Sequence, residues 1–221
     1  MKFTGYVTVR LNSKRLPGKS IKCLNGQTLI ERAIETLNDV PEIDETILYC
    51  SDDSISDHIS KDLSYRQIER PDYTNDDTSS FNDVLDSAIS RINTEYIVFL
   101  CCTSPFVKPE TISEMIQKIK KSSYDSSFAA REDSAFCWFN GAPLNYALIG
   151  PVPRTQDLVP VSVETSGLYI FSKTLFKSYS RRIGFNPYIK SLGIIESWDI
   201  DTPEDFIIAK AFSEIKDDIL G

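Results

Sequence analysis

The sequence has a single histidine, and this scarcity excludes several kinds of active site. A His-rich metal site is excluded, and a Ser–His–acid triad would depend on His58 alone. Cysteines are few, odd in number and irregularly spaced: Cys23, Cys50, Cys101, Cys102 and Cys137. That pattern fits neither a disulfide framework nor a zinc site. Free thiols are typical of a reducing compartment, so we expect a cytoplasmic protein.

Long hydrophobic runs and an excess of positive charge are also missing. No apolar stretch has the length of a signal peptide core or a bilayer span, so we expect no membrane association. A formal net charge of −8 argues against general nucleic-acid binding. The 221 residues, 41% hydrophobic and 25% charged, suit one large globular domain over residues 1–221.

Positive charge is nevertheless concentrated in one segment, RLNSKRLPGKS at residues 10–20. It follows directly on a predicted strand over residues 3–9. Backbone amides and cationic side chains of such a loop can surround phosphate oxygens at the carboxyl end of a strand. The segment lacks the Walker A pattern and the dinucleotide-binding glycines. A solvated basic turn is the alternative interpretation.

The remaining pattern alternates between strands and helices. Helices are expected at 28–37, 54–63, 81–92, 109–121, 174–179 and 201–219, and further strands at 45–51, 96–102, 125–132 and 166–172. We place Ile207, Ile208, Ala211, Phe212 and Ile215 on the apolar face of the last helix. This order indicates an α/β domain with a mainly parallel sheet. Residues 136–160 break the pattern with several Gly and Pro, which is typical of a functional loop or a partner-contacting arm.

Two carboxylates near the end of the sequence complement the basic loop. Asp199 and Asp201 in ESWDIDTPEDF are two residues apart, so in extended backbone they lie on one side. Mg²⁺ takes one or two carboxylates together with substrate phosphates. The alternative is that Asp201 merely caps the helix that begins near Pro203. With the basic loop, the pair predicts one metal–triphosphate site.

These motifs, in this order, resemble those of the cytidylyltransferases that make CMP-activated acidic sugars, above all the acylneuraminate branch. That family opens on R-x-x-S-K-R/G-L-P-x-K-N, and here Arg10 to Lys19 match it with Ser20 in place of the final Asn. IKCLNGQTLIERAI, SDD, RP, DDTSS, DVL, TSPF, RTQDL, SGLYIF and ESWDIDTPEDF follow in register. The resemblance covers nearly the whole chain. It implies a Rossmann-like nucleotide-diphospho-sugar transferase fold, with helices on both sheet faces and residues 136–160 as a protruding dimerisation arm.

The resemblance also implies roles for individual residues. The CTP-binding set would be Arg10, Asn12, Ser13, Lys14, Lys19, Arg70 and Ser80, and Asp199 and Asp201 would bind Mg²⁺. Lys19, Arg10 and Asp201 would be catalytic. The acceptor would meet Cys101, Thr103, Ser104, Arg154 and Gln156, the last two where the arm of a homodimer returns toward the substrate.

The identity of the acceptor stays open at this point. Members that use sialic acid commonly read L-Q-P-T-S-P with the Gln facing the sugar, whereas here Cys101 stands at that position. A thiol cannot replace the paired donor and acceptor of an amide. An acidic sugar, a small phosphorylated or phosphonate metabolite, and a catalytically silent homologue therefore remain as three hypotheses. Retention of Lys19, Asp199 and Asp201 argues against the third.

Overall fold

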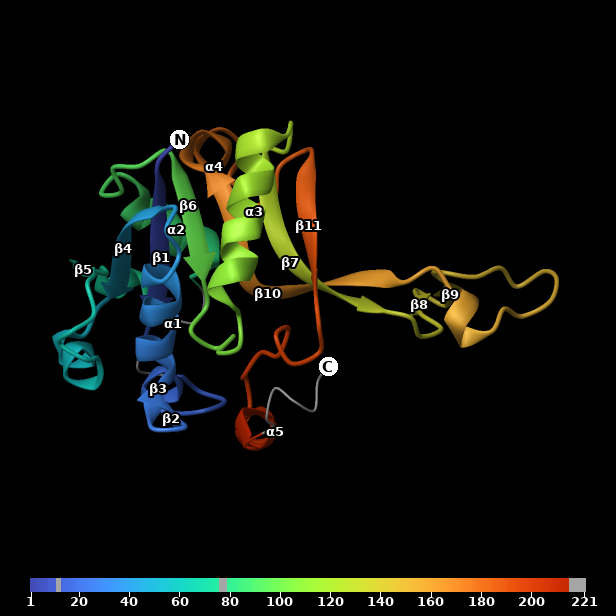
Figure 1. Ribbon diagram of the computed structural model, residues 1–221, viewed down its shortest axis with the longest axis horizontal. Helices are drawn as coiled ribbons and strands as arrows, with labels where there is room; N and C mark the ends of the chain where they lie inside the picture. The colour runs from blue at the N-terminus through green and yellow to red at the C-terminus, as the bar shows by residue number, and fades with distance from the viewer. Residues whose placement is uncertain (11–12, 76–78, 215–221) are drawn as a thin grey trace.

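A computed structural model describes residues 1–10, 13–75 and 79–214. The fold is built on a seven-stranded sheet (Figure 1). The strands run in the order β11-β7-β10-β6-β1-β4-β5. Their bounds are β1 Phe3–Val9, β4 Ile43–Cys50, β5 Arg66–Glu69, β6 Tyr96–Leu100, β7 Ser126–Asp133, β10 Val161–Ser172 and β11 Pro187–Leu192. β10 is antiparallel to β6 and β7, and the other neighbouring strands are parallel. The predicted mainly parallel α/β sheet is confirmed.

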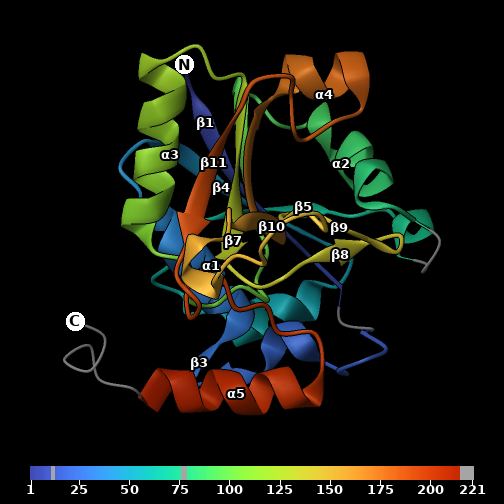
Figure 2. The same ribbon diagram turned by 90° about the vertical axis from the view of Figure 1, so that its right-hand side faces the viewer.

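Helices cover both faces of this sheet, as predicted (Figure 2). α1 (Leu29–Asn38) and α3 (Pro109–Lys121) lie on one face, and α2 (Phe81–Ile89) and α4 (Lys173–Tyr179) lie on the other. Apolar side chains of α1 and α3 pack in one buried cluster, and those of α2 and α4 pack in a second cluster across the sheet. Buried apolar area of this kind is the main favourable contribution to folding.

The strand order places a binding crevice beside β1. From β1 the chain passes through α1 to β4 on one side, and it later returns through α2 to β6 on the other side. Where connections diverge in this way, a crevice opens at the carboxyl ends of the two strands. The residues that follow β1 and β6 therefore face the same space.

Several elements differ from the sequence-based expectation. The helix expected at 54–63 is a short 3₁₀ helix, η2 (Asp53–His58), because serine and aspartate side chains bond the local backbone: Asp52 accepts from Ser54 N and Ser56 Oγ donates to Asp53 O. β5 and β11 were not predicted. Both are edge strands, and edge strands often lack a long apolar run. β10 begins at Val161 rather than residue 166.

The last helix, α5 (Pro203–Glu214), lies below the carboxyl ends of the strands (Figure 1). Its predicted apolar face is only partly right. Ile207, Ile208 and Ala211 are exposed, whereas Phe212 packs edge-on against the rings of Phe106 and Trp198. Ala209, which was not predicted, is buried, and Phe206 packs against the core. Ile215 lies outside the described residues.

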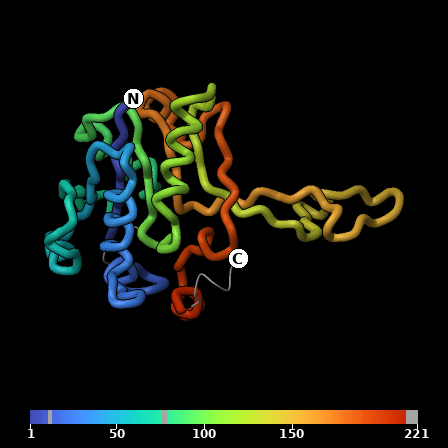
Figure 3. Tube along the Cα trace, in the orientation of Figure 1, coloured from blue at the N-terminus to red at the C-terminus, as the bar shows by residue number. Residues whose placement is uncertain are grey.

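The segment between β7 and β10 extends far from the sheet, and Figure 3 shows the chain leaving and returning beside itself. It contains a small hairpin, β8 (Trp138–Phe139) with β9 (Ala142–Pro143), and the 3₁₀ helix η4 (Thr155–Asp157). Tyr146 contacts the rings of Phe136 and Trp138 edge-on. We call residues 136–160 the arm.

Candidate functional site

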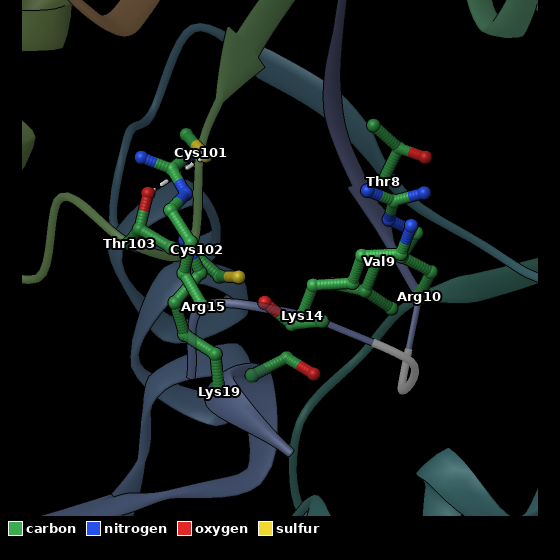
Figure 4. A pocket seen from close by; sticks show the side chains of 11 residues that line it. Thr8, Val9, Arg10, Lys14, Arg15, Lys19, Cys101, Cys102 and Thr103 are labelled. Atoms are coloured by element: carbon green, nitrogen blue, oxygen red, sulfur yellow. Dashed lines mark hydrogen bonds between the residues drawn. The ribbon is translucent and has the colours of Figure 1, made fainter. Parts of the chain in front are cut away.

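A cavity of about 390 Å³ opens at the carboxyl ends of β1 and β6. Its lining consists of Thr8, Val9, Arg10, Ser13, Lys14, Arg15, Lys19, Ser20, Cys101, Cys102 and Thr103. Thr8 to Arg10 border one side, Cys101 to Thr103 border the other, and Arg15 and Lys19 come from the basic loop (Figure 4). The structure thus brings together most of the predicted phosphate ligands and two of the predicted acceptor residues.

The basic loop is held in place by its own sequence. Leu16 is buried in the core and its carbonyl accepts from Lys19 N at 3.1 Å. Gly18 adopts φ 63° at the start of the 3₁₀ helix η1 (Lys19–Ile21). This left-handed conformation favours glycine because a Cβ would be strained there. The loop therefore directs Lys19 into the cavity instead of into solvent.

Lys19 connects the basic loop to the acidic motif across 182 residues of sequence. Its Nζ lies 2.9 Å from Asp201 Oδ1, and Arg15 Nη1 lies 2.8 Å from Asp201 Oδ2. The side chain of Lys19 is 17% exposed and that of Asp201 is 35% exposed. A solvated basic turn does not describe this arrangement. The loop and the acidic motif are therefore in direct contact.

The carboxyl groups of Asp199 and Asp201 have opposite electrostatic environments. Burial raises the pKa of Asp199, and the nearby charge of Asp201 adds to the increase. Burial also raises the pKa of Asp201, but the hydrogen bonds and charges of Lys19 and Arg15 outweigh it and lower that pKa overall. Thr103 Oγ1 donates to Asp199. Thr103 therefore orients one carboxylate, and Lys19 and Arg15 orient the other.

Asp201 is not the cap of α5. Thr202 Oγ1 accepts from Asp205 N at 3.2 Å, and Asp205 Oδ2 accepts from Thr202 N at 2.8 Å, which is a reciprocal capping box. The side chain of Asp201 is therefore free of the cap and contacts Lys19 and Arg15 of the basic loop. Within the described residues no group of three or more His, Cys, Asp and Glu side chains could hold a metal ion. Asp199 and Asp201 are two carboxylates, and Mg²⁺ commonly takes one or two carboxylates beside substrate phosphates.

The side chains of Arg70 and Ser80 are already engaged in structural hydrogen bonds, and Arg70 reaches the cavity lining through Thr8. Arg70 is buried below the end of β1, where it donates to Thr8 Oγ1 at 3.3 Å and to Thr74 Oγ1 at 3.0 Å. Burial lowers the pKa of its guanidinium group, and the charge of Arg10 acts in the same direction. Ser80 caps α2 in a capping box with Asp83. Either side chain would therefore have to contact a nucleotide while keeping these hydrogen bonds.

Cys101 and Cys102 are not poised as nucleophiles. Burial raises the pKa of both thiols, and more strongly for Cys102. Cys101 Sγ lies 3.0 Å from Thr103 Oγ1. The reactive form of cysteine is the thiolate, so these neutral side chains act as cavity wall.

Among the described residues, the predicted acceptor residues Ser104, Arg154 and Gln156 do not line the cavity of this chain. Ser104 packs against Gly167, where an added Cβ would lie 2.1 Å from Ser104 Oγ. Arg154 and Gln156 are exposed on the arm, and Arg154 Nε donates to Asp157 at 2.6 Å. Asn12 lies outside the described residues. The predicted site set omitted Arg15 and Cys102, for which membership of the basic loop and position after a buried strand were the available signals.

The described residues contain no helix that is both long and apolar enough to cross a bilayer. All five cysteines are free.

Comparisons with known proteins were made on both sequence and structure. A family model described as cytidylyltransferase matches residues 5–217. CMP-N,N'-diacetyllegionaminic acid synthase from Legionella pneumophila is 23% identical over 233 residues, 100% of each chain. N-acylneuraminate cytidylyltransferase from Streptococcus agalactiae is 23% identical over 91% of this chain and 51% of its own length. 3-Deoxy-manno-octulosonate cytidylyltransferase from Chlamydia pneumoniae is 26% identical over 53% of this chain and 45% of its own. The chain thus spans about half the length of these last two relatives.

Two solved structures share the fold. The CTP complex of CMP:2-keto-3-deoxy-manno-octonic acid synthetase has a TM-score of 0.71 and 15% identity, covering 96% of this chain and 98% of that chain. 4-Diphosphocytidyl-2C-methyl-D-erythritol synthase from Anaerococcus prevotii has a TM-score of 0.68 and 16% identity, covering 97% and 96%. Both the predicted fold and the predicted family are confirmed. The match over residues 5–217 shows that this chain belongs to the cytidylyltransferase family.

Proposed function

We propose that this protein transfers CMP from CTP to an acidic sugar of the sialic-acid or nonulosonic type and releases pyrophosphate. The observation that carries the proposal is the contact of Lys19 and Arg15 with Asp201 beside the cavity. Cations for a triphosphate and carboxylates for a metal ion are thereby joined in one place. The names of the relatives from Legionella and Streptococcus support an acidic sugar as acceptor.

In the proposed reaction an oxygen of the acceptor attacks the α-phosphorus of CTP. The new P–O bond forms as the bond from the α-phosphorus to the bridging oxygen breaks, and the electron pair leaves with pyrophosphate. Arg10, Lys14 and Lys19 would hold phosphate oxygens and neutralise the developing charge. Lys19 would exchange its contact with Asp201 for one with phosphate.

Asp199 and Asp201 would hold Mg²⁺, which supplies charge neutralisation at the phosphates when bound. Thr103 and the basic loop keep these two carboxylates oriented. An attacking sugar hydroxyl must lose a proton, and His58 is exposed on η2, outside the cavity lining. Loss of that proton would be aided by the metal ion or by a carboxylate, whereas an ionised acceptor would need no base.

The arm supports the proposal of a homodimer. Large apolar side chains are exposed on it: Trp138, Phe139, Leu144, Leu148, Ile149, Val152 and Val159. A contiguous exposed apolar surface is typical of an interaction site. A second copy that covers this surface would carry Arg154 and Gln156 toward a neighbouring cavity. The free thiols support a cytoplasmic location.

A second acceptor class is favoured by one observation. The cavity wall at Cys101 and Cys102 offers neutral thiols instead of an amide. A small phosphorylated or phosphonate metabolite would depend less on such an amide than a sialic acid would.

The test is pyrophosphate release from CTP and Mg²⁺ with a panel of acidic sugars, sugar phosphates and phosphonates. Release that requires one class of acceptor supports the proposal and identifies the acceptor. CTP binding without turnover of any acceptor would contradict the enzymatic proposal and favour a catalytically silent homologue.

A further inference from the structure

Arg182, in the loop between α4 and β11, has an unusual environment for a cation. Its guanidinium carbon lies 4.6 Å from the ring centre of Phe81 and 4.3 Å from that of Tyr169. The side chain is half-buried. Stacking on aromatic faces fixes the plane of the guanidinium group while leaving its N–H edges available to an anion.

Among the described residues, Arg182 forms no ion pair within 4 Å. Glu164 accepts a hydrogen bond from the hydroxyl of Tyr169, one of the two rings on which Arg182 stacks. Burial of a charge is unfavourable unless an opposite charge or hydrogen bonds compensate it. A guanidinium with free edges is well suited to bind a carboxylate or phosphate in bidentate geometry.

This cation is connected to the cavity through the face of the sheet that α2 covers. The rings of Phe81 and Tyr169 pack against Phe99, with centroids 4.4 and 6.1 Å away. Cys101, two residues after Phe99 and on the same face, packs against this aromatic cluster and lines the cavity. Arg182 does not itself line the cavity, and this aromatic cluster connects it to the cavity wall at Cys101.

Strand β10, which carries Tyr169, is irregular just before this residue. The register of β10 with β7 shifts between Glu164 and Tyr169, and Ser166 adopts φ 60° within this irregularity. Bulges next to binding sites commonly redirect side chains. Here the bulge brings Glu164 to the hydroxyl of Tyr169, which supports the ring on which Arg182 stacks.

We propose that Arg182 is a specificity-determining residue that binds an anionic group of the acceptor lying away from the attacking oxygen. The proposal rests on the proposed CMP transfer, and it narrows the acceptor class to molecules with a second negative charge. A carboxylate or a phosphate meets the same requirement, and the probes below distinguish them.

The experiment compares probes in matched pairs that differ by one remote anionic group. One pair is N-acetylneuraminate and its 9-phosphate, and the other is ethylphosphonate and phosphonoacetate. We expect the wild type to prefer the member with the remote charge in at least one pair. Arg182→Met should erase that preference with a loss of about 10- to 100-fold in kcat/KM, the range expected for a hydrogen bond to a charged group. The KM for CTP should stay unchanged.

Two variants separate recognition from packing. Arg182→Lys keeps a cation but loses the planar fork, so it should recover packing and only part of the preference. Arg181→Met is the matched control, because Arg181 also stacks on a ring, that of Phe185 at 5.3 Å, outside the aromatic cluster. It should leave the preference intact. An unchanged preference in Arg182→Met, or an equal loss for both members of each pair, would overturn the proposal.

Calorimetric titration of the same four probes decides the point even without turnover. Weaker binding of the remote-charge probes to Arg182→Met than to the wild type supports anion binding by Arg182. If none of the probes is turned over, the proposed CMP transfer fails separately from this result. Equal binding by both proteins, or binding by neither, contradicts the role of Arg182.

Discussion

Two aspartates at the start of the last helix show how neighbouring residues of one type acquire different functions. Asp201 contacts Lys19 and Arg15, which line the cavity, whereas Asp205 forms the capping box of α5 with Thr202. The site interaction and the cap interaction are thus four residues apart. This separation allows substitutions that affect one and leave the other.

We predict that Asp201→Asn lowers Mg²⁺-dependent pyrophosphate release by about 100-fold or more, the scale of losing one electrostatic contact at a reacting phosphate. The folded structure should persist, because Asp201 is partly exposed and makes no cap. Steady-state kinetics and thermal unfolding of the same preparation measure both effects.

Asp205→Ala is the matched control for that experiment. It should lower the free energy of unfolding by about 1 kcal/mol, the usual value of a helix cap, while Mg²⁺ dependence is retained. Wild-type turnover in Asp201→Asn would remove this residue from the site. Loss of turnover in Asp205→Ala at full stability would contradict the division of roles.

At the residue scale, sequence reasoning found the basic loop and the acidic pair but not the way they meet. The contact between Lys19 and Asp201 depends on how β1 and the segment after β11 are placed by the fold, which local patterns do not encode. The predicted site set omitted Arg15, because the family resemblance gave it no role and its partner is 186 residues away. The choice between a cap and a ligand for Asp201 required the position of Asp205.

At the scale of elements, the loop that carries Arg182 is held by one carboxylate. Asp125 Oδ2 accepts from Phe185 N at 2.6 Å and from Asn186 N at 3.1 Å. Gly184 approaches so closely that an added Cβ would lie 2.3 Å from Asp125 Oδ1. Burial raises the pKa of Asp125, but these hydrogen bonds outweigh it and lower the pKa overall.

This shift predicts a pH dependence of stability. A carboxyl group whose pKa is lower in the folded state stabilises the protein above its unfolded-state pKa, and the contribution is lost as the pH falls through the folded-state pKa. The stability advantage of wild type over Asp125→Asn should therefore shrink as the pH falls from about 6 to about 2. Urea unfolding across this range measures it. An advantage that is constant or grows toward acid pH would contradict the assignment.

Helix caps give a second prediction at this scale. Ser80 caps α2 beside the expected nucleotide position, and Ser172 caps α4, where it accepts from Leu175 N at 3.0 Å. Replacing either serine by alanine should cost about 1 kcal/mol of unfolding free energy. Only Ser80→Ala should also raise the KM for CTP, as kinetics of the two variants will show. Equal effects on that KM would place the nucleotide elsewhere.

Elements with strong periodicity were predictable and elements governed by local side-chain bonding were not. The helix at 109–121 is found at the predicted residues, because its apolar spacing and initial proline are unambiguous. Residues 54–63 have apolar spacing too, but their serines compete for the backbone. The edge strands β5 and β11 gain their pairing from neighbours that are distant in sequence.

At the scale of the whole molecule, the arm stands out because its apolar side chains are exposed among the described residues of a single copy. Leu148 and Ile149 are 68% and 94% exposed. If these side chains are buried in a homodimer, Ile149→Ser should raise the dimer dissociation constant by about 10-fold or more, following the free energy of burying an aliphatic side chain. Ile207→Ser, on an exposed part of α5, is the control. Sedimentation equilibrium measures both, and unchanged dissociation in Ile149→Ser would contradict an interface at the arm.

The central claim is that the basic loop and the acidic pair form one metal–triphosphate site. Calorimetric titration of CTP with and without Mg²⁺ tests it most directly. We predict tight binding with Mg²⁺, binding at least about 10-fold weaker in its absence, and no Mg²⁺ effect in Asp201→Asn. CTP affinity that is independent of Mg²⁺ in the wild type, or no CTP binding at all, would contradict the claim.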